Sequence, residues 1–265
     1  MQRRYPTEFV FQLAALLVSL ILVHAFYVTT VRPQADAELA RRAAQMQADP
    51  DFVPQRSVWV IVRDFEQEAC FVLMLWAIAI MAYKGIATAR QQRLLARQLV
   101  PRPEASRILP EDAREYARHV EALPAKLRTT LLPKALLSAL YRSSATRNIQ
   151  DVSETARAIC EAESDRLDSE LSMVRYIAWA IPSIGFIGTV RGIGEALSLA
   201  HKAVEGEIAG VTASLGVAFN STFIALLISI VLMFFLHQLQ LQQERFVLDT
   251  ETYLDHELIQ HLRVT

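Results

Sequence analysis

Four stretches of the sequence are long, apolar and poor in charge, and they restrict the chain to a membrane fold. Each is close to the roughly 20 residues that an α-helix needs to cross a hydrocarbon core about 30 Å thick. Because a spanning segment must satisfy its own backbone hydrogen bonds in lipid, each stretch is expected to be helical. The sequence therefore predicts an all-α, polytopic membrane protein with four transmembrane helices, at residues 9–31, 68–87, 176–197 and 211–237.

Basic residues gather directly after the second span, and this bias orients the chain. They are Lys84, Arg90, Arg93, Arg97, Arg102, Arg107, Arg114, Arg118, Lys126 and Arg128. Since Lys and Arg are enriched in cytoplasmic loops, we expect this segment to be inside. The chain would then be multi-pass, with both termini cytosolic. Its tail (1–8), helical domain (88–175) and C-terminal helix (238–265) are assigned to the cytosol, and its loops at 32–67 and 198–210 to the periplasm.

The N-terminus raises the question of processing. Ala35-Asp36-Ala37 fits a small-x-small cleavage rule after an apolar run that follows Arg3 and Arg4. The run is too long for a typical signal peptide, and the alanine pair lies several residues beyond it. We therefore expect an uncleaved anchor; cleavage would leave three spans in the same orientation.

The cytosolic segment is expected to be helical. The second span should continue until Pro101 and Pro103 stop it. Between Asp151 and Pro182 there is neither Pro nor Gly, which predicts one long helix that enters the membrane directly. Beyond the fourth span, Leu239, Phe246 and Tyr253 recur at seven-residue spacing, so that helix should also extend into the cytosol.

The third span carries a composition that a lipid-facing helix does not need. At helical spacing one face holds Pro182, Gly185, Thr189, Gly192 and Ala196, with Gly188 beside it. Gly and Pro loosen a helix, and an arginine is costly in hydrocarbon, so protein or water must cover the segment. We interpret this helix as lining a pore.

The fourth span has its own face of small residues, opposite the bulky Phe219, Leu226 and Met233. The small face holds Ala218, Thr222, Ala225 and Ser229, with Asn220 and Ser221 beside it. We call the two faces the small-residue stripes. Two interpretations stay open on the residues alone: the stripes pack the two helices together, or they leave room for a foreign helix or an ion.

The spans carry no Asp or Glu at their centres. Glu195 lies near the external end of the third span, one turn from Arg191, where the two side chains either neutralise each other or form a vestibule for the ion path. A titrating carboxylate in the membrane would therefore come from another chain. No catalytic grouping, phosphate loop or metal-ligand spacing occurs, and we expect no enzyme, no cofactor, no metal and no nucleic-acid partner.

The third span resembles a known signature. PSIGFIGTVRGIGEAL looks like the second-span motif of the MotA/TolQ/ExbB proton-channel family, a Pro followed by Gly-Leu-Leu-Gly-Thr-Val-x-Gly. The matching positions are Pro182, Gly185, Gly188, Thr189, Val190 and Gly192. Arg191 departs from the apolar or aromatic residue that is usual there. The resemblance covers about 161–237.

The fourth span, LGVAFNSTFIALLISI, is similar to the family's last span. Thr222 and Leu226 match it, whereas Ala225 stands where Gly is usual and Val231 replaces a Pro. The extra first span resembles the four-span MotA layout, while TolQ and ExbB have three.

The resemblance implies a homopentamer in a bacterial cell inner membrane, around a dimer of a single-span partner of the MotB/TolR/ExbD kind, which supplies the membrane aspartate. Thr189 and Thr222, with Ser221 beside them, would form the ion pathway that faces this aspartate, and the dimer would rotate. The expected ion is a proton, with sodium left open, and the process that is powered stays unassigned. The alternative function is a non-conducting membrane scaffold whose cytosolic helices recruit partners.

Overall fold

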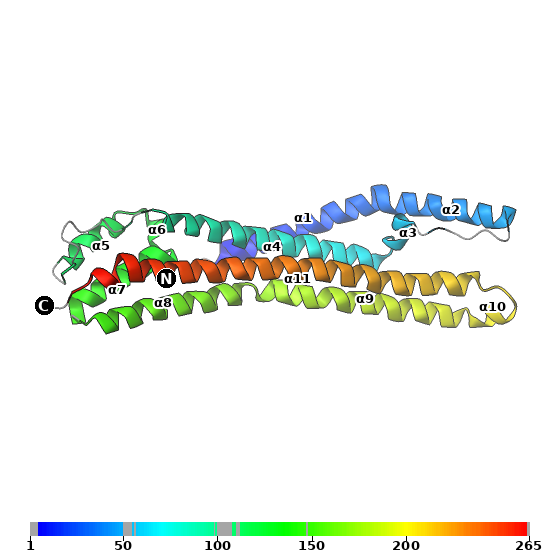
Figure 1. Ribbon diagram of the computed structural model, residues 1–265. Coiled ribbons are helices and arrows are strands. Elements are labelled where there is room, and N and C mark those ends of the chain that lie inside the picture. The colour runs from blue at the N-terminus through cyan, green and yellow to red at the C-terminus, as the bar shows by residue number, and fades with distance from the viewer. Residues whose placement is uncertain are drawn as a thin grey trace. The chain divides into compact units, whose positions relative to one another are not determined.

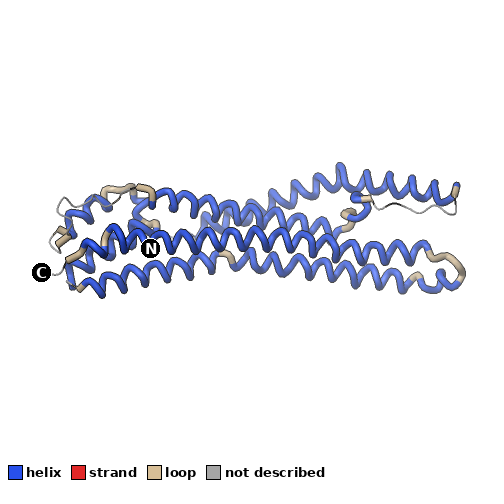
Figure 2. Tube along the Cα trace, viewed as in Figure 1, coloured by secondary structure: helices blue, strands red, loops and turns tan. Residues whose placement is uncertain are grey.

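The computed structural model describes residues 5–49, 55, 57–97, 99, 108–109, 112–146 and 148–263. These residues form helices and no strand, apart from an isolated parallel bridge between Ile108 and Leu262 (Figure 2). Helices that are long and apolar enough to cross a membrane occupy Thr7–Ala48, Phe65–Leu95, Ile149–Ser198 and Ala209–His261. The prediction of an all-α polytopic membrane protein is confirmed.

The chain divides into two compact units. The first, which we call the membrane unit, comprises Met1–Met81 and Met173–Leu236, and the second, the helical-core unit, comprises Ala82–Ser172 and His237–Thr265. Two long helices, α4 (Phe65–Leu95) and α11 (Ala209–Glu257), contribute residues to both.

The membrane unit begins with an unbroken helical run. Helix α1 (Tyr5–Phe26) passes through a π-helical turn, η1 (Tyr27–Val31), into α2 (Arg32–Ala48). Pro33 stands in the first turn of α2, two residues after η1; prolines and single π-helical turns are both places where long helices bend. The segment 32–67, predicted to be a loop, is thus largely helical in its described part: it contains α2, the short α3 (Val58–Ile61) and the first residues of α4.

Helix α9 (Ser172–Ser198) and α11 form a hairpin that is closed by the short α10 (Ala200–Val204), and the two long helices lie side by side (Figure 1). The helix predicted from Asp151 through Pro182 lies within the single span Ile149–Ser198, in which one residue, Leu171, is not helical. Helix α8 (Ile149–Glu170) ends before Leu171, whose N–H donates to the carbonyl of Asp168, three residues back, at 3.1 Å. This tighter turn interrupts the helix without any Pro or Gly.

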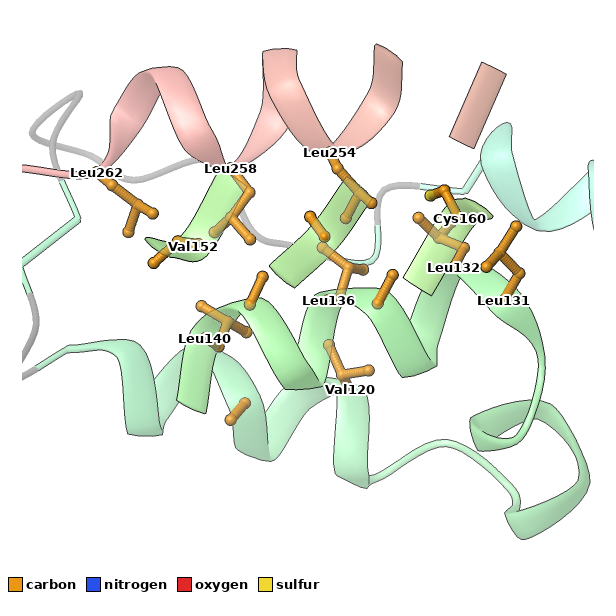
Figure 3. Close-up of a cluster of buried hydrophobic side chains, with 14 of the residues drawn as sticks. Val120, Leu131, Leu132, Leu136, Leu140, Val152, Cys160, Leu254, Leu258 and Leu262 are labelled. Atoms are coloured by element: carbon orange, nitrogen blue, oxygen red, sulfur yellow. The ribbon is translucent and has the colours of Figure 1, made fainter. Parts of the chain in front are cut away.

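The helical-core unit surrounds one apolar cluster. Helices α5 (Ala113–Glu121), α7 (Leu131–Thr146) and α8 enclose it with the end of α11 and the 3₁₀ turn η2 (Ile259–His261), and the short α6 (Ala125–Arg128) connects α5 to α7. Figure 3 shows its buried side chains, among them Val120, Leu131, Leu132, Leu136, Leu140, Val152, Cys160, Leu254, Leu258 and Leu262.

Local signals in the sequence account for these boundaries. The side chain of Asn148 caps α8 by accepting the N–H of Gln150. Helix α11 continues past the fourth span, as predicted from the apolar spacing of its C-terminal part. Helix α4 ends at Leu95, whereas Pro101 and Pro103, predicted to stop it, lie outside the described residues.

Candidate functional site

The two small-residue stripes meet along a seam between α9 and α11. A Cβ placed on Gly188 would lie 2.5 Å from the Cβ of Ser221, and one on Gly192 would lie 2.7 Å from the backbone N of Ala218. A Cβ on Gly185 would collide with the side chain of Ala225. Only glycine allows the two backbones to approach this closely, which is how small residues pack helices in membranes.

This seam corrects part of the sequence-based expectation. Gly185, Gly188, Gly192, Ala218 and Ala225 are buried against the opposite helix of the same chain, so they leave no slot for a partner helix between them. Of the two interpretations left open, the subunit adopts the one in which the stripes pack α9 onto α11. A partner helix would therefore have to contact another face of the hairpin.

Thr189 and Thr222 come together at the edge of the seam, and their hydroxyl groups are hydrogen-bonded to each other. The Thr189 hydroxyl also lies 3.0 Å from the carbonyl oxygen of Ala218 and 3.3 Å from that of Gly185. The Thr222 hydroxyl lies 3.1 Å from the same Gly185 carbonyl. These contacts are alternatives for the two hydroxyl protons, because each hydroxyl can donate only one, whereas each hydroxyl oxygen has two lone pairs that can accept. The pair, which we call the threonine pair, can therefore accept a hydrogen bond from outside.

The threonine pair is half-buried rather than sealed. At 100° per residue, Phe186 and Ile193 lie beside Thr189 on the flank of α9. Phe219 and Leu226 likewise lie beside Thr222 on the flank of α11, and not opposite the small-residue stripe as expected. All four of these apolar side chains are exposed in the subunit. The hairpin thus presents an apolar flank with two hydroxyl groups at its border with the seam.

Pro182 lies inside α9 and removes one helical hydrogen bond. The carbonyl that loses its donor belongs to Ala178, four residues earlier. The hydroxyl of Ser229 on α11 donates to this carbonyl at 3.2 Å. The Ser229 hydroxyl on α11 therefore replaces the hydrogen bond that α9 loses at Pro182, and the rest of the stripe packs against α9.

Arg191 forms a wider ion-pair cluster than the sequence indicated. It does pair with Glu195 at 3.0 Å, as expected, but its stronger contact is a two-pronged one with Glu66 of α4, at 2.7 and 2.9 Å. Asp64 lies 4.0 Å from the same guanidinium. Burial raises the pKa of the Asp64 carboxyl above its usual value, and the positive charge of Arg191 opposes this rise.

Two further polar residues in the first turn of α4 make contacts that were not predicted. Gln67 is fully buried and its amide donates to the hydroxyl of Ser221 at 3.4 Å. Glu68 pairs with Arg32 at 2.5 Å and with His24 at 2.7 Å. The available signal was a cluster of acids at the start of the second span, but their partners lie on distant parts of the chain. Among the described residues, no group of three or more His, Cys, Asp or Glu could hold a metal ion.

Comparison with known proteins gives one result. Residues 127–252 match the model of the MotA/TolQ/ExbB proton channel family, and this region contains both stripes and the threonine pair. Searches of curated proteins and of solved structures gave no match. Residues 127–252 therefore belong to the MotA/TolQ/ExbB proton channel family, and the chain is a multi-pass membrane protein of the proton-channel type.

Proposed function

We propose that this chain is the proton-conducting subunit of an inner-membrane motor driven by the proton-motive force. Five copies would surround a dimer of a single-span partner whose membrane aspartate faces the threonine pair, and both termini of each copy would be cytosolic. The observation that carries the proposal is the meeting of two hydroxyl groups at an accessible edge of the seam. The proposal assigns no catalytic residue and no cofactor.

The chemistry of the threonine pair suits a partner carboxyl group. A carboxylate in a low-dielectric site needs hydrogen-bond donors, and the same group loses its charge when it is protonated. Threonine hydroxyls donate to the charged form and accept from the protonated form without adding a fixed charge. Neither 176–197 nor 211–237 has an acidic residue near the pair, since Glu195 stands at the external end.

The partner helix is placed against the apolar flank rather than inside the seam. Phe186 and Phe219 are about two-thirds exposed in the subunit, at 65% and 67%, which leaves apolar area for a membrane helix to cover. In this arrangement the partner's aspartate reaches the threonine pair from the side, and rotation of the dimer would bring it to each subunit in turn.

The direct test is proton flux through the purified complex, with its single-span partner, in liposomes. We expect Thr189→Val and Thr222→Val each to abolish flux while the subunit stoichiometry stays the same. Thr222→Ser, which keeps a hydroxyl, should retain flux. The matched control is Thr212→Val on the same helix, because the Thr212 hydroxyl contacts only the carbonyl of Ile208, four residues earlier in the chain. Replacing external sodium with potassium during the assay separates a proton from a sodium current.

A non-conducting scaffold is the competing function, and the closed seam favours it. Two helices that fill each other's small faces need no ion path to explain their composition. A scaffold would show normal biological activity in both valine variants and no flux in liposomes. That combination would exclude the motor.

A further inference from the structure

Three consecutive side chains at the start of α4 each contact a different helix of the membrane unit. Glu66 pairs with Arg191 of α9, Gln67 donates to Ser221 of α11, and Glu68 pairs with Arg32 at the start of α2. We call Glu66, Gln67 and Glu68 the α4 triplet. All three lie outside the region that the family model matches.

The first two contacts of the triplet converge on one backbone position. A Cβ on Gly188 would lie 2.6 Å from the Ser221 hydroxyl and 3.1 Å from the Cγ of Glu66. Gly188 directly precedes Thr189, and Ser221 directly precedes Thr222. The contacts of α4 therefore reach α9 and α11 immediately beside the threonine pair.

Gln67 lowers the stability of the fold more than an apolar residue would at the same buried position. Its side chain is 0% exposed, and its Oε1 has no hydrogen-bond partner. A buried polar atom without a partner is destabilising, and a leucine of similar size would avoid this cost. Unlike leucine, the amide forms directional hydrogen bonds. Its Nε2 donates to the Ile61 carbonyl at 3.1 Å and to the Ser221 hydroxyl at 3.4 Å.

We propose that Glu66 and Gln67 are positioning residues for the threonine pair. Glu66 fixes α9 through Arg191, and Gln67 fixes α11 through Ser221, so that the two helices hold the register in which Thr189 meets Thr222. Because Glu66 and Gln67 are neighbours in one turn of α4, the two contacts fix α9 and α11 relative to the same part of α4. The geometric part of this proposal is independent of conduction, and its consequence for flux rests on the proposed function.

Disulfide formation at the threonine pair measures this register. Thr189→Cys and Thr222→Cys are introduced together into a chain that carries Cys70→Ala and Cys160→Ala. The rate of oxidation within a subunit is followed by the loss of maleimide–polyethylene glycol labelling without covalent dimers. We expect Gln67→Leu to slow this oxidation by about fivefold, the factor that corresponds to losing one hydrogen bond, while the melting temperature of the complex stays the same or rises.

The matched control is Gln92→Leu, the same substitution on the same helix, where the amide contacts Asp249 in the helical-core unit. It should leave the oxidation rate unchanged. Ser221→Ala should reproduce the effect of Gln67→Leu, and the two together should slow oxidation no further, because they remove the same contact. Glu66→Gln should also slow oxidation, whereas Glu66→Asp should restore part of the rate.

Two results would overturn the proposal: an unchanged oxidation rate in Gln67→Leu, or a slower rate with a matching fall in melting temperature. In the chain that keeps both threonines, Gln67→Leu should also lower proton flux without loss of assembly. If the threonine variants conduct normally, the proposed function fails, yet the oxidation rates still decide whether Glu66 and Gln67 set the register.

Discussion

The hydroxyl of Ser229 on α11 donates to the carbonyl of Ala178 on α9, the acceptor that Pro182 leaves without its helical donor. A proline inside a helix and a serine 47 positions later, on the returning helix, thus form one structural unit. This relationship predicts that the two residues are energetically coupled, and that neither can be judged alone.

Ser229→Ala should lower the free energy of unfolding by about 1 kcal/mol, because it leaves the Ala178 carbonyl without a partner. In a chain that carries Pro182→Ala, residue 182 regains an N–H for that carbonyl, and Ser229→Ala should then cost less. Denaturation of the four proteins in mild detergent gives the coupling energy. Ser183→Ala is the control, since the Ser183 hydroxyl contacts the Trp179 carbonyl of its own helix. Simple additivity would show that Ser229 does not compensate for the proline.

Gly188→Ala should destabilise the membrane unit by about 1–3 kcal/mol, the usual cost of forcing a methyl group into a well-packed contact. The added carbon would press against Ser221 on the opposite helix. Gly194→Ala is the comparison on the same helix, because nothing lies within 4 Å of the added carbon there. It should be neutral or stabilising by up to about 1 kcal/mol, through helix propensity alone. Equal effects of the two substitutions, measured by thermal unfolding, would contradict close packing at the seam.

Glu68→Gln should loosen α1 and α2 from the membrane unit. The Glu68 side chain is 10% exposed; it pairs with Arg32 of α2 and contacts the His24 ring of α1, so removing its charge leaves Arg32 without its counterion. We expect a loss of about 1–3 kcal/mol and faster proteolysis within α2. Glu38→Gln, which removes a more exposed pair within α2, should cost less than about 0.5 kcal/mol. Unchanged proteolysis in Glu68→Gln would show that other contacts hold these helices.

Cys160 should react slowly with maleimide at neutral pH. Its side chain lies in the core of the helical-core unit, and burial raises the pKa of its thiol from 9.0 to about 11. The thiolate fraction at pH 8 is then about 100-fold smaller than for an ordinary thiol, and it grows tenfold per pH unit up to about pH 11. Labelling is measured in Cys70→Ala, with an exposed thiol from Ala145→Cys in a chain lacking both natural cysteines as the reference. Comparable rates at pH 8 would mean that the core opens readily.

The spans, the stripes and the threonines could be predicted because each depends on local pattern. Hydropathy over about 20 residues marks a span, and helical spacing places Thr189 and Thr222 on small faces. The contacts of Glu66 and Gln67 could not be predicted, because their partners lie 125 and 154 residues away. The break at Leu171 has no Pro or Gly to mark it. The sequence could not decide whether the two stripes pack against each other, since small residues occur both in tightly packed helix contacts and along open ion paths.

The surplus of oxygen contacts over protons at Thr189 and Thr222 has a dynamic consequence. The hydroxyl hydrogens can be distributed in more than one way while every heavy atom stays in place. Passing from one distribution to another takes only rotation about a Cβ–Oγ bond, which belongs to the picosecond-to-nanosecond range of side-chain motion. A group that arrives beside these oxygens therefore finds a donor or an acceptor long before any helix has had time to move.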